Sequence, residues 1–354
     1  MHLGACLVYQ HCLGRSPSAV DRWQSLREVS LDIPNLEPYA LQHLAGLLSL
    51  RVLELHVPPD SALNETFPDL RPRPKPLGLG GPRPPPFSGL QRFAMGGEID
   101  TFLYGTVVDV FLNHLKKLKF SPRCVNLLVK FEGADIPAIL EATASSTNLS
   151  ELQEFYLRRW HRRKEPQAGF DKIRGMLGWC NLTKVKLGIS IATNDSELGE
   201  ISMAWPLLEE LHFVAEPAES PRLPTWIGFI DLTRRCRRLE SVGVPVDTTL
   251  GAEGVLEEID SEGRFKDKEL MNSHFDSINF LGSKIHDADM VARILRALFP
   301  ALSWRRFFVF SRSPPHFQYI RHFLSLHPVG TLTDRFSRAS SDISFGRSDS
   351  NPWN

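Results

Sequence analysis

The sequence predicts an α/β protein, a curved solenoid in which one parallel sheet carries helices on its outer side. A six-residue pattern, apolar-x-x-apolar-x-apolar, recurs as LREVSL, LRVLEL, LQRFAM, LQEFYL, LTKVKL, LEELHF, LESVGV and FDSINF, starting at residues 26, 50, 90, 152, 182, 208, 239 and 275. Between the copies lie segments whose apolar residues recur at the helical period of three and four. Strands that alternate with helices through right-handed crossovers form a parallel sheet.

Each six-residue copy is expected to be a strand with one buried face. Its last two apolar residues are two apart, so both point to the same side, and the residue between them points to the other side. The widest gap, between the copies at 90 and 152, has room for a degenerate copy near VNLLVKF from Val125. A strand is therefore also expected there.

Helices are expected at 106–118, 169–180, 224–236 and 287–299, where the apolar spacing is helical. An aromatic residue followed by proline precedes the next strand's leucine at Phe67-Pro68, Trp205-Pro206 and Phe299-Pro300. Because proline cannot continue a helix, these pairs mark the helix ends. Cys180 and Cys236 stand at the equivalent joints, and we expect both to be small buried residues rather than redox groups.

One strand and helix cannot cover their own apolar sides, so neighbouring units must stack to form a core. The predicted solenoid spans 22–335, after an irregular N-terminal segment at 1–21. A proline-rich insertion at 68–86 is expected to be an extended linker, with a docking site for an aromatic groove as the alternative. A charged segment at 251–272 is a solvated loop or a polar helix, and the serine-rich tail at 336–354 is expected to be mobile.

Charge and cysteine content exclude several classes of function. Lysine and arginine number 41 and so do aspartate and glutamate, so no net charge attracts nucleic acid or an anionic membrane. No apolar run approaches the roughly eighteen residues that span a bilayer. The 5 cysteines form no CxxC pair and no metal-binding spacing, which favours a reducing, intracellular compartment, either cytoplasm or nucleus.

Familiar catalytic and cofactor motifs are absent from the sequence. Gly78, Gly80 and Gly81 lie among prolines, without the strand and helix that a phosphate loop requires. His286, Asp287 and Asp289 could ligate a metal, but a helix cap at Asp287 explains them better. His316, His322 and His327 do not share a helical face. We therefore expect no enzyme activity, no metal and no cofactor.

A basic run contains Arg158, Arg159, Arg162, Arg163 and Lys164. It could be a nuclear import signal or a phosphate-binding patch. The favoured interpretation is a solvated loop that follows the strand ending at Leu157. Five charges on a neutral protein would bind nucleic acid only weakly and in a salt-dependent way.

The strand pattern resembles leucine-rich repeats, and residues 204–249 resemble the leucine-rich repeat region of F-box proteins that are abundant in mushroom-forming fungi. CNLTKVKLGISIATNDSELGEISMAWP and IHDADMVARILRALFPAL are similar to flanking parts of that family, so the resemblance covers roughly 22–330. It implies a solenoid with the sheet on the concave face and helices on the convex side. It also implies a substrate-binding adaptor of an SCF-type ubiquitin ligase.

Two features depart from that family. The asparagine or cysteine expected after each strand is replaced, at Pro34, Pro58, Ser190, Glu216 and Asp247. No asparagine ladder is therefore expected. The F-box module is not visible before Leu26, which leaves three alternatives open: a fragment, a truncated gene model, or a relative that lost the module. A ubiquitin-ligase linker subunit is an expected partner only if an F-box exists upstream.

The candidate binding site is the set of side chains on the concave sheet face. The repeat register nominates Glu28, Ser30, Glu54, Arg92, Glu154, Tyr156, Arg158, Lys184, Lys186, Glu210 and His212. Their mixed signs suit a protein partner better than a polyanion, with Tyr156 and Arg158 as the strongest anchors. We expect a non-enzymatic recognition protein, monomeric outside its complex. The alternatives are a ligase-independent scaffold, and an enzyme built on a repetitive parallel sheet.

Overall fold

The computed structural model describes residues 26–32, 44–56, 87–96, 115–116, 120–129, 131–159, 168–213, 223–262, 275–280, 283 and 287–299. Several expectations lie outside these residues: the segment 1–21, the insertion 68–86, the helix at 106–118 apart from 115–116, the basic residues 162–164, the second half of the charged segment, the histidines at 286, 316, 322 and 327, and the tail 336–354.

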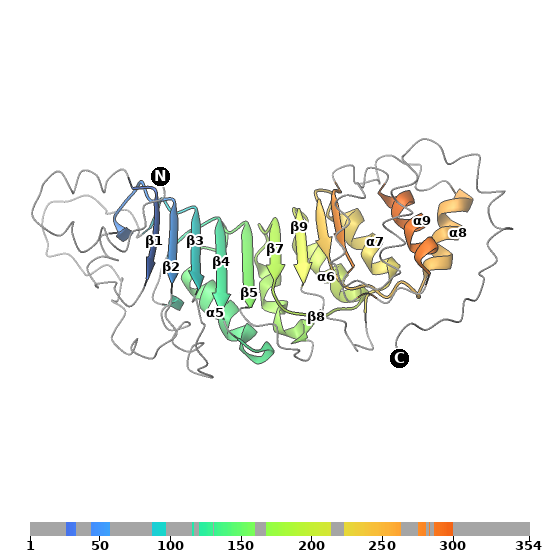
Figure 1. The fold of residues 1–354 in the computed structure, drawn as a ribbon, viewed down its shortest axis with the longest axis horizontal. Helices are drawn as coiled ribbons and strands as arrows, with labels where there is room; N and C mark the ends of the chain where they lie inside the picture. The colour runs from blue at the N-terminus through green and yellow to red at the C-terminus, as the bar shows by residue number, and fades with distance from the viewer. Residues whose placement is uncertain are drawn as a thin grey trace, which may run out of the picture.

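The protein is α/β, and its described residues form a 9-stranded parallel sheet whose strands follow one another in chain order (Figure 1). The strands are β1 (Glu28–Asp32), β2 (Val52–His56), β3 (Arg92–Gly96), β4 (Cys124–Val129), β5 (Glu154–Arg159), β7 (Lys184–Leu187), β9 (Glu210–Phe213), β10 (Ser241–Gly243) and β11 (Ser277–Asn279). Each six-residue copy, including the degenerate one near Val125, contains one of them. The predicted strand positions are therefore confirmed.

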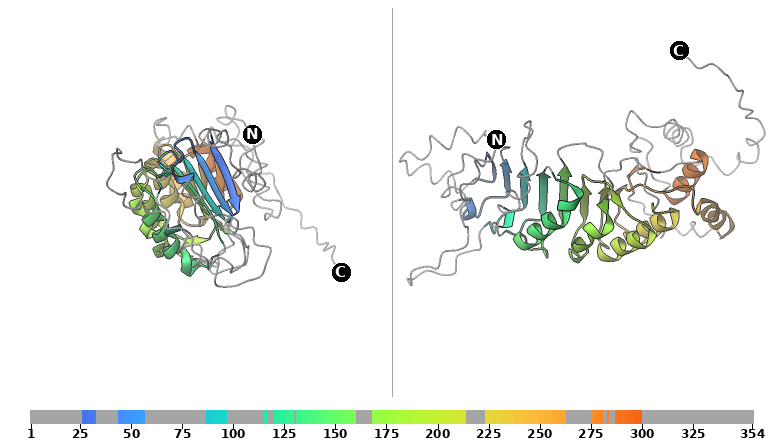
Figure 2. Two further views of the ribbon diagram at one scale, coloured as in Figure 1. Left: turned by 90° about the vertical axis from the view of Figure 1, so that its left-hand side faces the viewer. Right: turned by 90° about the horizontal axis from the view of Figure 1, so that it is seen from below.

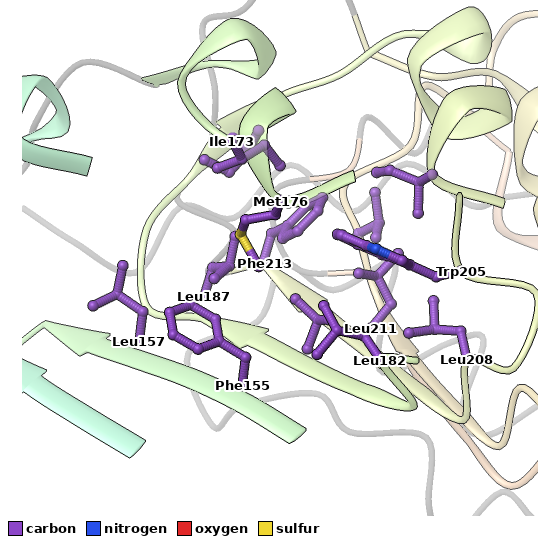
Figure 3. Packing of buried hydrophobic residues seen from close by; sticks show 14 of the residues in the cluster. Phe155, Leu157, Ile173, Met176, Leu182, Leu187, Trp205, Leu208, Leu211 and Phe213 are labelled. Atoms are coloured by element: carbon purple, nitrogen blue, oxygen red, sulfur yellow. The ribbon is translucent and has the colours of Figure 1, made fainter. Parts of the chain in front are cut away.

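The strands pair so that the same repeat positions face each other. Val185 of β7 lies opposite Phe155 of β5 and Leu211 of β9, and Val242 of β10 continues the row. All four side chains are buried. Leu187 and Phe213, two positions further along β7 and β9, are buried as well (Figure 3). Burying one such side chain contributes about 1.5–3 kcal/mol, so stacked neighbours provide the core that one unit lacks.

Helices α5 (Ile136–Ser146), α6 (Asp195–Ala204) and α7 (Trp226–Arg235) lie along one side of the sheet (Figure 2). Helices α8 (Ala252–Glu262) and α9 (Ala288–Leu298) lie at its C-terminal end. The predicted helices at 224–236 and 287–299 are confirmed as α7 and α9. The charged segment, for which a loop and a polar helix were both open, begins with the helix α8.

Side-chain caps fix where three of these helices begin. Asn194 accepts a bond from the Glu197 amide at 3.0 Å before α6, Thr225 caps α7, and Asp287 accepts from the Met290 amide at 3.0 Å before α9. The capping role expected for Asp287 is confirmed. Each such cap contributes on the order of 1 kcal/mol, because it satisfies an amide that has no partner within the helix.

The helix expected at 169–180 is wrong. This segment contains β6 (Ala168–Gly169) and two short 3-10 helices, η4 (Phe170–Lys172) and η5 (Arg174–Gly178). β6 pairs with β8 (Ile191–Ala192) in a separate two-stranded ladder. Gly175 and Gly178 explain the difference, because glycine in a helix interior costs roughly 1 kcal/mol relative to alanine.

The joint between helix and strand places one buried residue three positions before the strand's leucine. Its carbonyl accepts that leucine's amide: Trp205 from Leu208 at 3.1 Å and Cys236 from Leu239 at 2.9 Å. Cys236 is fully buried, as expected. The expectation for Cys180 is wrong, because Cys180 stands one residue later in the register and is exposed. The buried position there belongs to Trp179, which is 3% exposed.

Candidate protein-binding face of the sheet

The side of the sheet opposite α5, α6 and α7 presents two rows of side chains, which we call the sheet face. The first row is Ser30, Glu54, Ala94, Asn126, Tyr156, Lys186, His212, Gly243 and Asn279. The second row is Glu28, Val52, Arg92, Cys124, Glu154, Lys184, Glu210, Ser241 and Ser277. The sheet face therefore contains nearly all of the nominated residues.

Charged residues at the centre of the sheet face neutralise one another. Lys184 Nζ lies 3.7 Å from Glu154 Oε1 and 3.6 Å from Glu210 Oε1, and Lys186 Nζ pairs with Glu210 Oε2. These side chains are 20–40% exposed, so each pair contributes at most about 1 kcal/mol. Two lysines and two glutamates leave this centre without net charge.

The same ion pairs shift the pKa values of Glu210 and Lys184. Burial alone would raise the pKa of Glu210, but the hydrogen bond and charge of Lys186, with the charge of Lys184, bring that pKa below its usual value. Burial opposes the charge on Lys184, yet Glu154 and Glu210 raise its pKa. Both ions therefore remain charged across the physiological range.

Tyr156 contacts two members of these ion pairs, Glu154 and Lys186. Its hydroxyl donates to Glu154 Oε2 at 3.2 Å, and Lys186 Nζ lies 5.7 Å from the centre of its ring. Burial, followed by the negative charge of Glu154, raises the pKa of Tyr156. The ring is half-buried, so a partner that covers it would remove an aromatic surface from water without creating an unpaired hydroxyl.

His212 is a neutral imidazole within the sheet face. Burial, together with the positive charge of Lys186, lowers the pKa of His212 to about 4. Its Nε2 lies 2.8 Å from Ser241 Oγ. A Cβ added at Gly243 would lie 2.4 Å from His212 Nδ1, so the ring occupies the space that a side chain on the neighbouring strand would need.

Cys124 sits between Arg92 and Glu154 in the second row. Burial, with the nearby charge of Glu154, raises the pKa of the Cys124 thiol to about 12. Only the thiolate is a good nucleophile, so this cysteine is inert at neutral pH.

Asn126 of the first row has a buried Oδ1 that accepts no hydrogen bond from the described residues.

The structure brings together the nominated residues Glu154, Tyr156, Lys184, Lys186, Glu210 and His212 on three adjacent strands. Arg158 is exposed near the end of β5, beyond the ion pairs. Arg92, on β3, is also exposed. Glu28 and Glu54 lie on β1 and β2, separated from the centre by β3 and β4.

Sequence reasoning missed Cys124, Asn126, Ser241 and Gly243. The first two belong to the degenerate strand, whose alternation would have placed them outward had its register been fixed. The role of Gly243 depends on the imidazole of the next strand, and no pattern within its own segment indicates that contact.

Within the described ranges, no group of three or more His, Cys, Asp or Glu side chains is arranged to hold a metal ion. No helix in the same part of the chain is long and apolar enough to cross a membrane. Comparison with known proteins finds no family model that matches the chain and no curated protein that matches it.

Proposed function

We propose that the chain is a leucine-rich-repeat solenoid that recognises a protein target on its sheet face and catalyses no reaction. The observation that carries the proposal is the self-neutralised centre of that face, where an aromatic ring lies among paired ions. A surface without net charge gives a polyanion little long-range attraction. A protein partner can use the ring and the exposed Arg158 as anchors.

By resemblance, we infer that the target is a substrate of an SCF-type ubiquitin ligase and that the protein acts inside the cell, in the cytoplasm or nucleus. The resemblance in residues 204–249 to fungal F-box proteins supports this role. A ligase-independent scaffold would use the same face. The two differ in one measurable property, because only the adaptor retains the ligase's linker subunit through an F-box.

The test of recognition compares matched surface variants. Tyr156→Ala with Arg158→Ala removes both anchors from the sheet face. Met203→Ala with Ile227→Ala changes exposed side chains of α6 and α7, which are 63% and 58% exposed. We expect the target to bind both the wild type and the helix variant. Its affinity for the sheet-face variant, measured with purified components, should be at least tenfold lower.

A set of bound proteins that is identical for all three chains would contradict recognition by the sheet face. Copurification of the linker subunit with the full-length gene product separately tests the adaptor role. If the linker subunit is not retained while the face-dependent target is, the scaffold interpretation replaces the adaptor.

A further inference from the structure

The residues that directly precede the strands form a continuous row along one edge of the sheet. Each residue donates its amide to the carbonyl of the residue before it in the row, from Arg51 to Arg27 at 2.7 Å through to Asp276 to Glu240 at 2.7 Å. All strands are parallel, so their starts lie along the same edge (Figure 1). We call this set the strand-start row.

The two ends of the strand-start row carry opposite charges. Arg27, Arg51 and Arg123 precede β1, β2 and β4, whereas Glu209, Glu240 and Asp276 precede the last three strands. The residues between these groups, and the one before β3, are uncharged. The six charged residues are exposed or half-buried. Charges that cancel on the sheet face are therefore separated along the edge.

The outer two charges at each end of the row are complementary on reversal, whereas Arg123 and Glu209 fall opposite the uncharged Thr183 and Gln91. The central member, before β5, is Gln153. If the row is reversed about Gln153, Arg27 falls opposite Asp276 and Arg51 falls opposite Glu240. Because neighbouring strands are a constant distance of about 4.8 Å apart, both pairs come into register together. A two-fold axis imposes this arrangement, in which residue i meets j and j meets i.

We propose that the strand-start row binds a second copy of the same chain, antiparallel, with the two-fold axis at Gln153. Both halves of the contact are on the same molecule, so charge complementarity itself selects the partner. This differs from the monomer that the sequence predicts. It also goes beyond the proposed function, because the sheet face remains free for a target.

Charges of the opposite sign also lie near both ends of the row. Glu28 follows Arg27 at the basic end, and the exposed Arg237 and Arg238 lie three and two residues before Glu240 at the acidic end. Arg27, Arg123 and Glu240 form no ion pair with other described residues. The complementarity of the row therefore resides in its paired positions, and not in the net charge of each end.

The expected contact is weak and sensitive to salt. Nine strand positions extend over roughly 40 Å, and a single edge row is narrow compared with the roughly 800 Å² per partner of a stable interface. Ionic pairing at the surface is screened within about 10 Å at 0.1 M salt. Association is therefore expected at micromolar to submillimolar concentrations, and it should decline as salt increases.

The experiment is sedimentation velocity on the full chain, at up to about 200 µM and at two salt concentrations, 50 and 500 mM NaCl. The mass should rise from 40.0 kDa toward twice that value at low salt and fall back at high salt. Arg51→Glu and Glu240→Arg should each weaken association at least tenfold. The double variant, or a mixture of the two single variants, should restore it.

This rescue distinguishes the contact from a folding defect. Arg51 Nη1 donates to the Gly89 carbonyl at 2.6 Å, so Arg51→Glu alone could perturb the edge, but a fold lost in that way would not return with Glu240→Arg. Arg235→Glu on α7 and Glu253→Arg on α8 are the matched charge controls and should associate as the wild type does. A chain that stays monomeric at low salt would overturn the proposal. So would a dimer whose association is unchanged by salt and by both Arg51→Glu and Glu240→Arg.

Discussion

Lowering the pH tests the environment of His212. In the folded chain its pKa is about 4, whereas an exposed histidine titrates near 6.5. Between these values the unfolded chain binds a proton that the folded chain does not, so stability falls as the pH falls from 6.5 toward 4 and is unaffected above 6.5. At pH 4.5, two units below the ordinary pKa of histidine, this proton uptake lowers the free energy of unfolding by about 2.5 kcal/mol.

The assay is urea unfolding of the wild type and His212→Gln at pH 7.5, 6.5, 5.5 and 4.5. Glutamine cannot take up a proton, yet it can still bond to the neighbouring Ser241. Acidic residues and other histidines titrate in both chains, so the difference between the two curves isolates His212. We expect the free energy of unfolding of the wild type to fall by about 2.5 kcal/mol more than that of the variant.

The charge on Lys186 gives a second check, because it is the next cause of the low pKa after burial. Lys186→Met should raise the pKa of His212. In that background, His212→Gln should therefore change the pH dependence of the free energy of unfolding by less than it does in the wild type. An imidazole that titrates near 6.5 by NMR, or pH curves of the wild type and His212→Gln that run parallel, would refute the reasoning.

Three further predictions concern packing and reactivity. Leu211→Ala should lower the free energy of unfolding, measured in urea, by about 2–5 kcal/mol. Met203→Ala, at a side chain that is 63% exposed, should change it by less than about 0.5 kcal/mol. Equal effects of the two variants would contradict the stacked core. Asp195→Ala removes the carboxylate that accepts 2.6 and 2.8 Å bonds at the start of α7 and should cost about 1–3 kcal/mol, while Asp195→Asn should cost less. In the folded chain at pH 8, iodoacetamide should alkylate Cys180 much faster than Cys124, as followed by mass spectrometry, and equal rates would disprove the burial of Cys124.

The strands could be predicted because their signal is local. In each copy three large apolar side chains repeat at fixed positions, and stacking buries nearly all of those that the structure describes, as with Leu182, Val185 and Leu187. The helix α5 was missed because its buried side is built partly from small or polar residues. Ala142, Thr143 and Ser146 are buried there. The Thr143 hydroxyl donates to the Ile139 carbonyl and the Ser146 hydroxyl donates to the Ala142 carbonyl.

The charged members of the sheet face could be predicted from alternation, but their pairing could not. Alternation places Glu154, Lys184 and Glu210 on one side of three strands. Which side chains meet depends on the register between strands, and here residues 30 and 26 positions apart become direct neighbours. The low pKa of His212 likewise arises from burial by neighbouring strands, a property that no single segment contains.

Stacking also determines which variants can separate recognition from stability. The central strands β5, β7 and β9 place Phe155, Val185 and Leu211 in the core, so a change at these positions loosens the units on both sides. Their outward neighbours are only partly buried and lie on rigid strands. A change at Tyr156 or Arg158 should therefore remove an anchor while leaving the free energy of unfolding within about 1 kcal/mol of the wild type. A loss of target binding without a loss of stability would assign the anchor to the sheet face itself.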